Sequence, residues 1–346
     1  MTDYFSQKPN SIVVCSNGGA QRGHTVTTPD AIRHVFHHFG SGIFNRASTY
    51  LSEDFIVNPI IFKQEYDELM KLNYVPNTYI NQNCMVTTPF DMMANQIIEE
   101  SRGKNKHGSC GLGAFETIKR YKAGVTDMDY NIRDYYVDLF KRENIILSSE
   151  WIRIFMDNGI FEHFLDDWDF MNSHSLTITD NYFLNQFDNI VFEAAQGLLL
   201  DQNNTEYFPH LTPSNTGIKN PKKIIENIEW NDEINIETCY VSRTYLTRHG
   251  AGKFPSECSK SLINEYMYDH TNVPNPFQDT LRYGTFDLGE LYSRCSNDVG
   301  DFGNQKSLAL THCNEYDWDN EKLVELFKDW NIYYSDGETH QDIELR

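Results

Sequence analysis

Short apolar runs that each lead into a polar or glycine-rich loop are the feature that most constrains the fold of this chain. The run from Ile190 to Phe192 is followed by Glu193 and Gln196, and the loop 212–217 then supplies Ser, Asn and Thr side chains. Buried strands of parallel sheets are continuous apolar segments, and binding sites lie beyond their carboxyl ends. Folding alone does not require such polar residues, so the pattern predicts an α/β fold with a site at these strand ends.

Strand-like runs alternate with segments of helical periodicity, which favours a mostly parallel sheet. The pattern predicts strands at 12–15, 190–193, 238–246 and 308–310. It predicts helices at 62–72, 91–100, 130–142, 222–228 and 320–330. No Gly/Ser/Pro-rich linker divides the 346 residues, and an apolar content of 40% allows a large core. We therefore expect a single α/β domain over residues 1–346, built around a large mostly parallel sheet with helical insertions.

The net charge and the cysteines limit the possible partners. A formal charge of −21 argues against a nucleic-acid groove, so an anionic substrate must be held by local donors. The seven cysteines show no zinc-like spacing, which is typical of reduced thiols in a cytosolic protein. No basic and apolar leader is present, and no run approaches the roughly 20 apolar residues of a membrane span. We expect a cytoplasmic protein without a membrane partner, located in the host cytoplasm if the gene is viral.

The first glycine turn, from Ser16 to Val26, directly follows the first predicted strand and contains His24. Its three glycines let the backbone approach a ligand closely, and the imidazole can donate a proton to a phosphoryl group or accept one from it. From this segment alone, a loop with a surface histidine is the alternative.

The second glycine turn, from His107 to Thr117, leads into a helix predicted to begin near Ala114. Free N–H groups at a helix start and the Ser109 hydroxyl form a natural phosphate site, and the basic residues Arg120 and Lys122 follow. A capped helix entry with exposed basic residues is an equally good interpretation.

The third loop, from Tyr245 to Glu257, also follows a predicted strand. It places Arg248 before a Gly-Ala-Gly turn and Lys253 after it. The guanidinium suits a phosphate or carboxylate, but it could equally close the loop by donating to backbone carbonyls. Three such turns together indicate a binding site more strongly than any one of them.

The order and wording of these motifs resemble the adenylosuccinate synthetase family. That family carries a GGxNAGHT-like turn, a TTGRGIGPAY-like turn, an FEGAQGxLLD strand end, a TSSNT loop and an STRVGAGPFPTE loop. The corresponding segments here are 18–25, 108–115, 192–201, 212–216 and 246–257, in the same order. The resemblance implies a C–N ligase that joins L-aspartate to C6 of a purine nucleoside monophosphate through a 6-phosphoryl intermediate.

The resemblance also implies roles for individual residues. His24 would act at the transferring phosphate, assisted by Gln196, and the Gly23 carbonyl would lie near Mg²⁺. The residues implied to bind the monophosphate or aspartate are Gln21, Ser109, Cys110, Lys122, Gln196, Thr212, Arg248, Gly250, Thr280 and Arg282. Those implied to bind the triphosphate, ATP or GTP, are Gly23, His24, Thr25, Thr311, His312, Cys313, Asn314 and Gly337. The family's basic residue that reaches into a neighbouring subunit is matched by Lys122, with Arg120 the other candidate, so a homodimer is implied.

Three departures from the family pattern bear on activity. No GDEGKGK-like phosphate loop precedes Ser11, and residues 2–5 look like a helix interior, so we expect a trimmed gene start or loss of that loop and its general base. The LTKxD-like guanine-reading segment is 310–317 here and lacks its Lys and Asp, which makes adenine nucleotides plausible. The aspartate-binding loop, 276–284, offers Arg282 as its only guanidinium.

These departures and the tail 333–346 are most similar to the phage branch, the 2-aminoadenylosuccinate synthetases, which add aspartate to dGMP and can use adenine nucleotides. The sequence leaves dGMP and IMP open as acceptors, and ATP and GTP open as donors. The alternative function is a non-catalytic homologue that senses or sequesters purine nucleotides.

Overall fold

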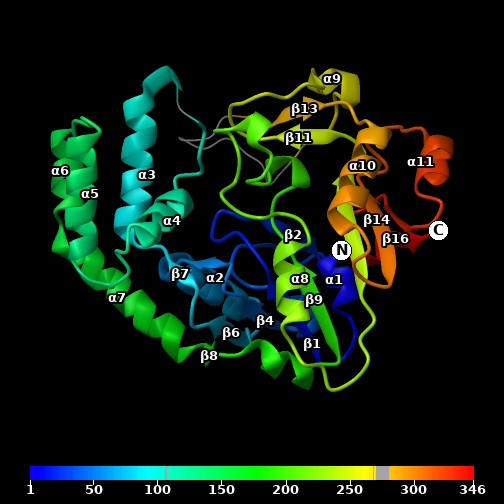
Figure 1. The fold of residues 1–346 in the computed structure, drawn as a ribbon, viewed down its shortest axis with the longest axis horizontal. Helices are drawn as coiled ribbons and strands as arrows, with labels where there is room; N and C mark the ends of the chain where they lie inside the picture. Colours follow the sequence, from blue (N-terminus) through cyan, green and yellow to red (C-terminus); the bar gives the residue numbers. More distant parts are fainter. Residues whose placement is uncertain (106, 268, 270–279) are drawn as a thin grey trace.

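A five-stranded, all-parallel sheet lies at the centre of the computed structural model, which describes residues 1–105, 107–267, 269 and 280–346 (Figure 1). Strand β1 is buried along its whole length, which explains why Ile12 to Cys15 carries only apolar side chains. Because β1 pairs with β9 in parallel, with Cys15 beside Glu193, the loops that follow these two strands start side by side. The strand order is β8 (Leu176–Ile178), β6 (Thr78–Asn81), β4 (Ser48–Leu51), β1 (Ser11–Cys15) and β9 (Asn189–Glu193).

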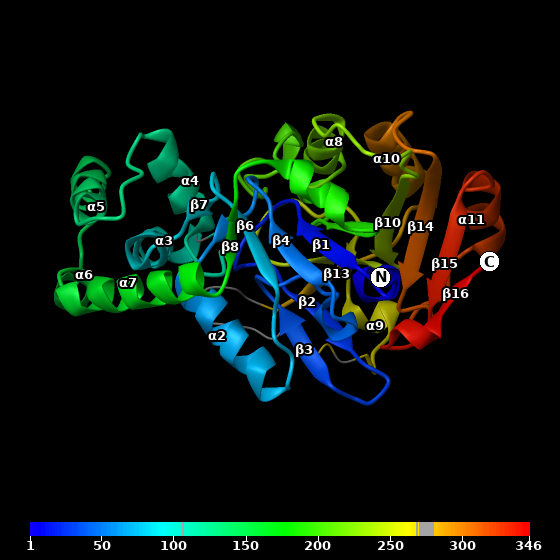
Figure 2. The ribbon, with the colours of Figure 1, turned by 90° about the horizontal axis from the view of Figure 1, so that it is seen from below.

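A second sheet of four strands lies to one side of the first (Figure 2). Its first three strands are parallel and its last is antiparallel. Leu308 and Leu310 pack there against Leu323 and Phe327. The parallel α/β fold is therefore confirmed, although the strands predicted for one large sheet are divided between two. The order is β10 (Glu237–Arg243), β14 (Gln305–Thr311), β15 (Asn331–Ser335) and β16 (Ile343–Leu345), with helices α10 (Leu288–Val299) and α11 (Asn320–Leu326).

Smaller sheets of two or three short strands lie within the loops around these two sheets. The predicted strand 238–246 is wrong at its end, because β10 stops at Arg243 and the chain then joins a separate antiparallel sheet. That sheet contains β11 (Leu246–Arg248), β13 (Arg282–Gly284) and β12 (Glu257–Cys258). Two further pairs are β2 (His24–Thr27) with β3 (Arg33–Phe36), and β5 (Ile56–Val57) with β7 (Met85–Val86).

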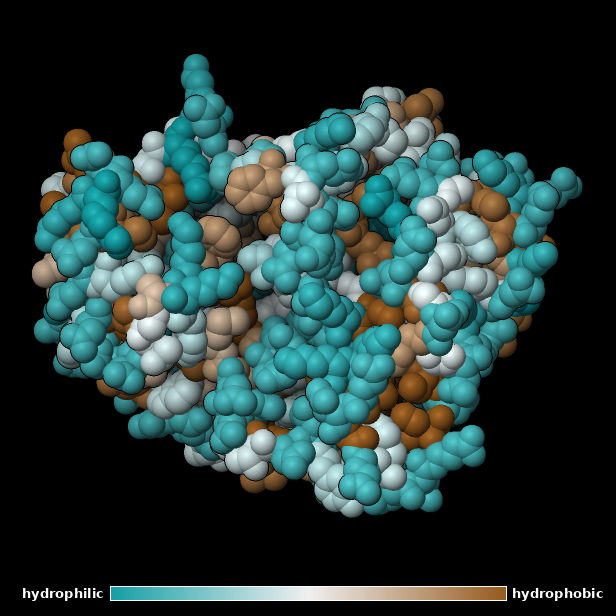
Figure 3. All heavy atoms as spheres, viewed as in Figure 1, coloured by the Kyte–Doolittle hydropathy of each residue, from teal (hydrophilic) through white to brown (hydrophobic). Residues whose placement is uncertain are grey.

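Helices α3 (Pro89–Arg102) to α7 (Asn158–Ser173) gather at the end of the molecule opposite the second sheet (Figures 1 and 2). The predicted helices are all present, with ends shifted by up to four residues. None of the helices in the described part of the chain is both long and apolar enough to cross a bilayer. Hydrophilic residues cover most of the face in Figure 3, as the negative charge leads one to expect. The remaining helices are α1 (Thr2–Phe5), α2 (Pro59–Lys71), α4 (Ala114–Lys122), α5 (Asn131–Arg142), α6 (Ser149–Phe155), α8 (Lys219–Glu226) and α9 (Lys260–Ile263).

Arg120 joins α4 to α3 inside the protein, so the prediction that it is an exposed, phosphate-binding or intersubunit residue is wrong. Its side chain is fully buried, and Nε and Nη2 donate to the Asp91 carboxylate at 2.8 and 3.0 Å. Tyr136 of α5 donates to the same carboxylate at 2.5 Å. Sequence periodicity did not reveal this burial because the partner lies 29 residues away. The network orients α4, and with it the second glycine turn.

We expect Arg120→Met to lower the free energy of unfolding by roughly 3–5 kcal/mol, because it leaves the buried Asp91 charge without its partner. The measurement is urea unfolding followed by circular dichroism. Lys141 and Asp138 form an exposed ion pair and provide the control: Lys141→Met should change the same quantity by less than about 1 kcal/mol. Equal losses in the two variants would contradict a structural role for the buried pair.

Candidate active site

Asn17 ties the first glycine turn to the loops that follow β9. Its amide donates to the carbonyls of Ala195 and Asn215 at 3.0 and 2.8 Å, and its carbonyl accepts from the Ala195 N–H at 2.7 Å. Asn220 donates to the Ser16 carbonyl from the other side. These contacts bring the strand end and the 212–216 loop together as predicted. The motifs assigned no role to Asn17 or Asn220, and only their burial beside polar loops identifies them.

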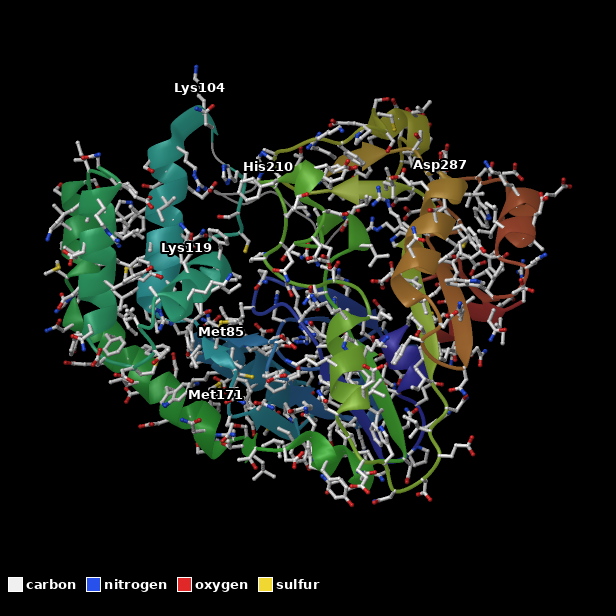
Figure 4. All side chains as sticks on the ribbon, in the orientation of Figure 1. Met85, Lys104, Lys119, Met171, His210 and Asp287 are labelled. Atoms are coloured by element: carbon white, nitrogen blue, oxygen red, sulfur yellow. The ribbon has the colours of Figure 1, made fainter. Side chains whose placement is uncertain are left out.

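A cavity of about 100 Å³ opens beside this turn. Two predicted substrate ligands, Gln21 and Thr212, lie in it, together with Met85, which Figure 4 labels. Gln21 Oε1 and Asp54 Oδ2 are buried and accept no hydrogen bond from any described residue, which leaves both available to a ligand. The full lining is Gly18, Gln21, Asp54, Ile56, Met85, Ala114, Ile118, Gln202, Thr212, Pro213, Ser214, Asn215 and Asn220.

Gln196 lies at the strand end but outside the lining of this smaller cavity. Its backbone has φ of 72°, a left-handed conformation that costs a non-glycine residue on the order of 1–3 kcal/mol. Its side chain is exposed. The structure therefore places Gln196 on a strained, accessible turn, while Gln21 and Thr212 lie together in the cavity.

Glu193, the last residue of β9, lies between Arg22 and His24. Its Oε2 accepts a 3.0 Å hydrogen bond from Nη1 of Arg22, and its Oε1 lies 3.1 Å from Nδ1 of His24. Burial acts to raise the pKa of Glu193, but His24 and Arg22 more than offset this and hold the pKa well below its usual range. The ionised carboxylate lies beside Nδ1 of His24, although that buried nitrogen makes no hydrogen bond to the described residues.

The backbone N–H groups of the second glycine turn already donate to a carboxylate of the protein. Glu99 accepts from the N–H groups of His107 and Gly108 at 2.9 and 3.0 Å, and Ser109 donates to Asn95 at 2.9 Å. Helix α4 begins at Ala114 as predicted, but its N-cap residue makes no side-chain hydrogen bond. An anion can use the two amides of the turn only after displacing Glu99.

The third loop lies directly against the second turn. Gly108 and Gly250 are in backbone contact, and a Cβ on Gly108 would lie 3.0 Å from the Gly250 Cα. Arg248 closes this loop, because it donates to the carbonyls of Ala251 and His210, the latter labelled in Figure 4. Of the two interpretations, the bonding of backbone carbonyls is the one found.

Arg282 is also engaged by the protein. It makes a bidentate ion pair with Glu257 at 2.8 and 2.5 Å and donates to the carbonyls of Gly250 and Gly252. Thr280 is exposed near this strand, and residues 276–279 of the predicted aspartate loop lie outside the described residues. An aspartate substrate would have to compete with Glu257 for the guanidinium.

A larger cavity of about 430 Å³ lies on the other side of the first turn. It gathers six of the residues predicted to bind the triphosphate, which come from three separate segments: Gly23, Thr25, Thr311, His312, Asn314 and Gly337. His312 has φ of 61°, so it too is held in a left-handed conformation. Cys313 does not line this cavity and donates its thiol to the Leu310 carbonyl at 3.3 Å.

The first turn thus runs from one cavity to the other. Gly18 and Gln21 line the smaller cavity, whereas Gly23 and Thr25 line the larger one and flank His24 in sequence. Lys122 is exposed at the end of α4, and Cys110 is half-buried with a thiol whose pKa is raised by burial. Within the described residues, no group of three or more His, Cys, Asp or Glu side chains could hold a metal ion.

This arrangement defines an α/β protein with two cavities joined by a glycine turn. A sequence model of the family "Adenylosuccinate synthetase" matches residues 1–312, so the chain belongs to that family. The adenylosuccinate synthetase of Picosynechococcus sp. is 30% identical over 280 residues, or 76% of this chain and 60% of that protein. The enzyme of Lactobacillus acidophilus is 28% identical over 351 residues, or 93% and 78%. The chain spans about three fifths of the length of several curated relatives that it matches.

Two solved structures share the fold. The fully ligated adenylosuccinate synthetase from Plasmodium falciparum superposes with a TM-score of 0.72 at 14% identity, covering 100% of this chain and 95% of that one. The succinoaminodeoxyadenylate synthetase of cyanophage S-2L, bound to dGMP and dATP as an energy donor, superposes with a TM-score of 0.62 at 16% identity, covering 99% and 89%. These similarities confirm the expected fold.

The buried carboxyl of Glu116 in α4 should make the free energy of unfolding depend on pH. Its side chain is buried, its Oε2 lacks a hydrogen-bond partner among the described residues, and burial raises its pKa to about 7. The unfolded chain releases this proton near pH 4.5, so the free energy of unfolding falls as the pH rises from about 4.5 to 7. This fall in the free energy of unfolding is about 3 kcal/mol, and Glu116→Gln should abolish it.

Urea unfolding at pH 4.5 and pH 8 measures this effect. The variant should gain stability relative to the parent protein at pH 8, while Glu226→Gln, at an exposed position, should keep the parent's pH dependence. The same pH dependence in the Glu116→Gln variant and the parent would show that the carboxyl is not strained by burial.

Proposed function

We propose that this protein is a ligase that joins L-aspartate to C6 of a purine nucleoside monophosphate while a purine nucleoside triphosphate is hydrolysed. The observation that supports this most is the first turn, which connects the cavity of Gln21 and Thr212 with the cavity of Thr311 and Asn314. A phosphoryl group that passes between two nucleotides needs two sites that meet where the phosphoryl group is transferred. His24 lies in sequence between the residues that line them.

In this proposal the protein contributes positioning and hydrogen bonds rather than covalent chemistry. Gln21, Thr212 and Gln196 hold the monophosphate, and His24 bonds to the transferring phosphoryl group. Arg282 exchanges Glu257 for a carboxylate of aspartate.

Mg²⁺ is the cofactor that this proposal implies, and Gly23 lines the larger cavity. In phosphoryl transfer this ion takes most of its ligands from phosphates and water, so it needs few protein oxygens, and the Gly23 carbonyl is the one implied. When bound, it neutralises charge on the transferring phosphate. The proposal includes a homodimer in which Lys122 reaches the monophosphate site of the partner subunit. The side chain of Lys122 is exposed, as such a contact requires.

We assign dGMP as the acceptor and an adenine nucleotide as the donor. Asn314 stands where the family has the aspartate that accepts from guanine, and it makes no side-chain hydrogen bond to the described residues. An amide offers both a donor and an acceptor, which complements the edge of adenine, whereas a carboxylate offers acceptors alone. The resemblance of the tail 333–346 to the phage branch supports dGMP.

The reaction is tested by phosphate release from ATP and from GTP. We expect release only when aspartate and one purine monophosphate are both present, with dGMP the best acceptor, and loss of at least about 100-fold in His24→Gln. A protein extended upstream by any in-frame coding segment should be assayed in parallel. Release that ignores aspartate, or none in either form, would reject the ligase and leave a nucleotide-binding protein.

Donor choice is tested by equilibrium binding of ATP and GTP. The protein should bind ATP more tightly, and Asn314→Asp should shift the ratio of the two dissociation constants toward GTP by about 10-fold or more, because each base-specific pair is worth about 1–3 kcal/mol. Asn320→Asp adds the same charge outside the cavity and should leave the ratio unchanged. Preference for GTP in the parent protein would argue against the assignment of adenine, and binding of dGMP no tighter than IMP would argue against dGMP.

A further inference from the structure

Asp54 is a carboxylate of the smaller cavity to which none of the sequence motifs assigned a role. It lines the cavity, and its Oδ2 is buried and accepts no hydrogen bond from the described residues. The adjacent carboxylate is different, because Glu53 is paired with Lys223 at 2.5 Å. Buried polar atoms of folded proteins nearly always have a partner, and those without one are commonly completed by water, an ion or a ligand. Asp54 is therefore a candidate ligand contact.

Hydrogen bonds at both ends of its segment hold Asp54 beside the first glycine turn. The Ser52 hydroxyl donates to the Cys15 carbonyl at 2.9 Å, which fastens the start of the segment to the end of β1. The Ile56 N–H donates to the Gly18 carbonyl at 2.9 Å, which fastens the other end of the segment to the turn. Asp54 lies midway between these two ties. The strand end that positions the turn therefore also positions Asp54.

No cation balances the Asp54 carboxylate within the cavity. Among the described residues, the lining contains no Lys, Arg or His side chain. Burial raises the pKa of Asp54, and the opposing charge of Lys223 does not cancel this effect. A phosphate next to this carboxylate would be repelled, whereas a neutral N–H donor would satisfy its free oxygen. This wall of the cavity therefore suits a neutral, donor-bearing part of a ligand rather than its phosphate.

Gln21 supplies a second free acceptor in the same cavity. Its Oε1 is buried and accepts no hydrogen bond from the described residues. A Cβ on Gly19 would lie 3.0 Å from this oxygen and 2.7 Å from the Ile56 carbonyl oxygen. Gly19 and Ile56 form a parallel bridge, so Gln21 and Asp54 lie on the two segments that this bridge joins. The cavity therefore contains two free acceptor oxygens on a fixed backbone.

The free acceptors match the donor edge of guanine. The apolar side chains of Ile56, Met85 and Ile118 line the same cavity and suit the faces of a flat base, and Met85 is labelled in Figure 4. Guanine carries two neighbouring donors, N1–H and the exocyclic 2-amino group, whereas hypoxanthine lacks the 2-amino group. The proposed reaction changes the base at C6 and leaves the 2-amino group intact. A hydrogen bond from that group can therefore persist from substrate to product.

We propose that Asp54 is a specificity-determining residue: its carboxylate accepts a hydrogen bond from the 2-amino group of the purine monophosphate and thereby selects dGMP over the same nucleotide with hypoxanthine. This inference rests on the proposed function, since it requires a purine monophosphate in the smaller cavity. It adds a physical reason for the choice of acceptor, because a hypoxanthine base would leave the Asp54 oxygen buried and unpaired.

Equilibrium binding of dGMP and deoxyinosine monophosphate (dIMP) to the full chain tests the proposal, because these nucleotides differ only in the 2-amino group. In calorimetry, dGMP should bind about 10-fold to 100-fold more tightly than dIMP. Asp54→Ala should remove this preference by weakening dGMP, with the dissociation constant of dIMP changed less than about 3-fold. The control is Asp138→Ala, which removes an exposed carboxylate of α5 and should preserve the preference.

Asp54→Asn provides a second variant in case the alanine variant does not fold. It keeps the size of the side chain and one carbonyl acceptor but removes the charge, so the preference for dGMP should be smaller than in the parent protein. Because Oδ2 of Asp54 accepts no hydrogen bond from the described residues, neither substitution should lower the free energy of unfolding in urea. Equal weakening of dGMP and dIMP would overturn the proposal, because Asp54 would then act on the fold.

The ligation assay separates failure of this inference from failure of the proposed function. In aspartate-dependent phosphate release, Asp54→Ala should lower kcat/KM for dGMP about 10-fold to 100-fold and change kcat at saturating dGMP less than about 3-fold. Three results would overturn the inference and leave the ligase intact: equal affinity of the parent protein for dGMP and dIMP, a preference that survives Asp54→Ala, or a change confined to the comparison of dGMP with GMP, which tests the sugar hydroxyl. Binding of neither nucleotide, with no phosphate release, would reject the ligase and this inference together.

Discussion

The burial of the Glu193 carboxylate is the constraint on which the candidate site depends. A charge at the end of a buried strand is tolerated only with close partners of opposite charge. Arg22 meets this requirement from a glycine turn that must therefore fold back over the end of β9, and His24 of the same turn lies 3.1 Å from the carboxylate. The same fold-back places Gln21 at one cavity and Gly23 at the other. The need to pair the buried Glu193 carboxylate thus fixes the position of the turn relative to the strand end and to both cavities.

In the second and third loops, the N–H donors that could bind an anionic ligand already donate to acceptors of the protein itself. Glu99 binds the amides of the second turn, Glu257 binds Arg282, and backbone carbonyls bind Arg248. In a chain with a net charge of −21 this keeps cations and exposed amides compensated. Ligand binding would then be an exchange of partners, so its free energy is the difference between two sets of hydrogen bonds.

Much of the fold could be predicted because its signals are local. The apolar run of β1, the caps of α2 and α3 and the start of α4 at Ala114 all follow from neighbouring residues. The division of the strands between two sheets could not be predicted, since periodicity identifies a strand without its neighbour. Arg120 shows the same limit: its position between Lys119 and Lys122 in the last turn of α4 suggested exposure, whereas its partner Asp91, 29 residues away, lies with it in the interior.

The sequence by itself determined the family, the order of the glycine turns and some of the residues that line the two cavities, among them Gln21, Thr212 and Thr311. Those features depend on residues close together in the chain and on the rule that parallel strands end at one edge. The tertiary structure decided which charges are paired, because Arg22 and Glu193 are 171 residues apart. No local pattern encodes a partner at that separation. The pairing of Arg22 with Glu193 became visible only in the folded structure.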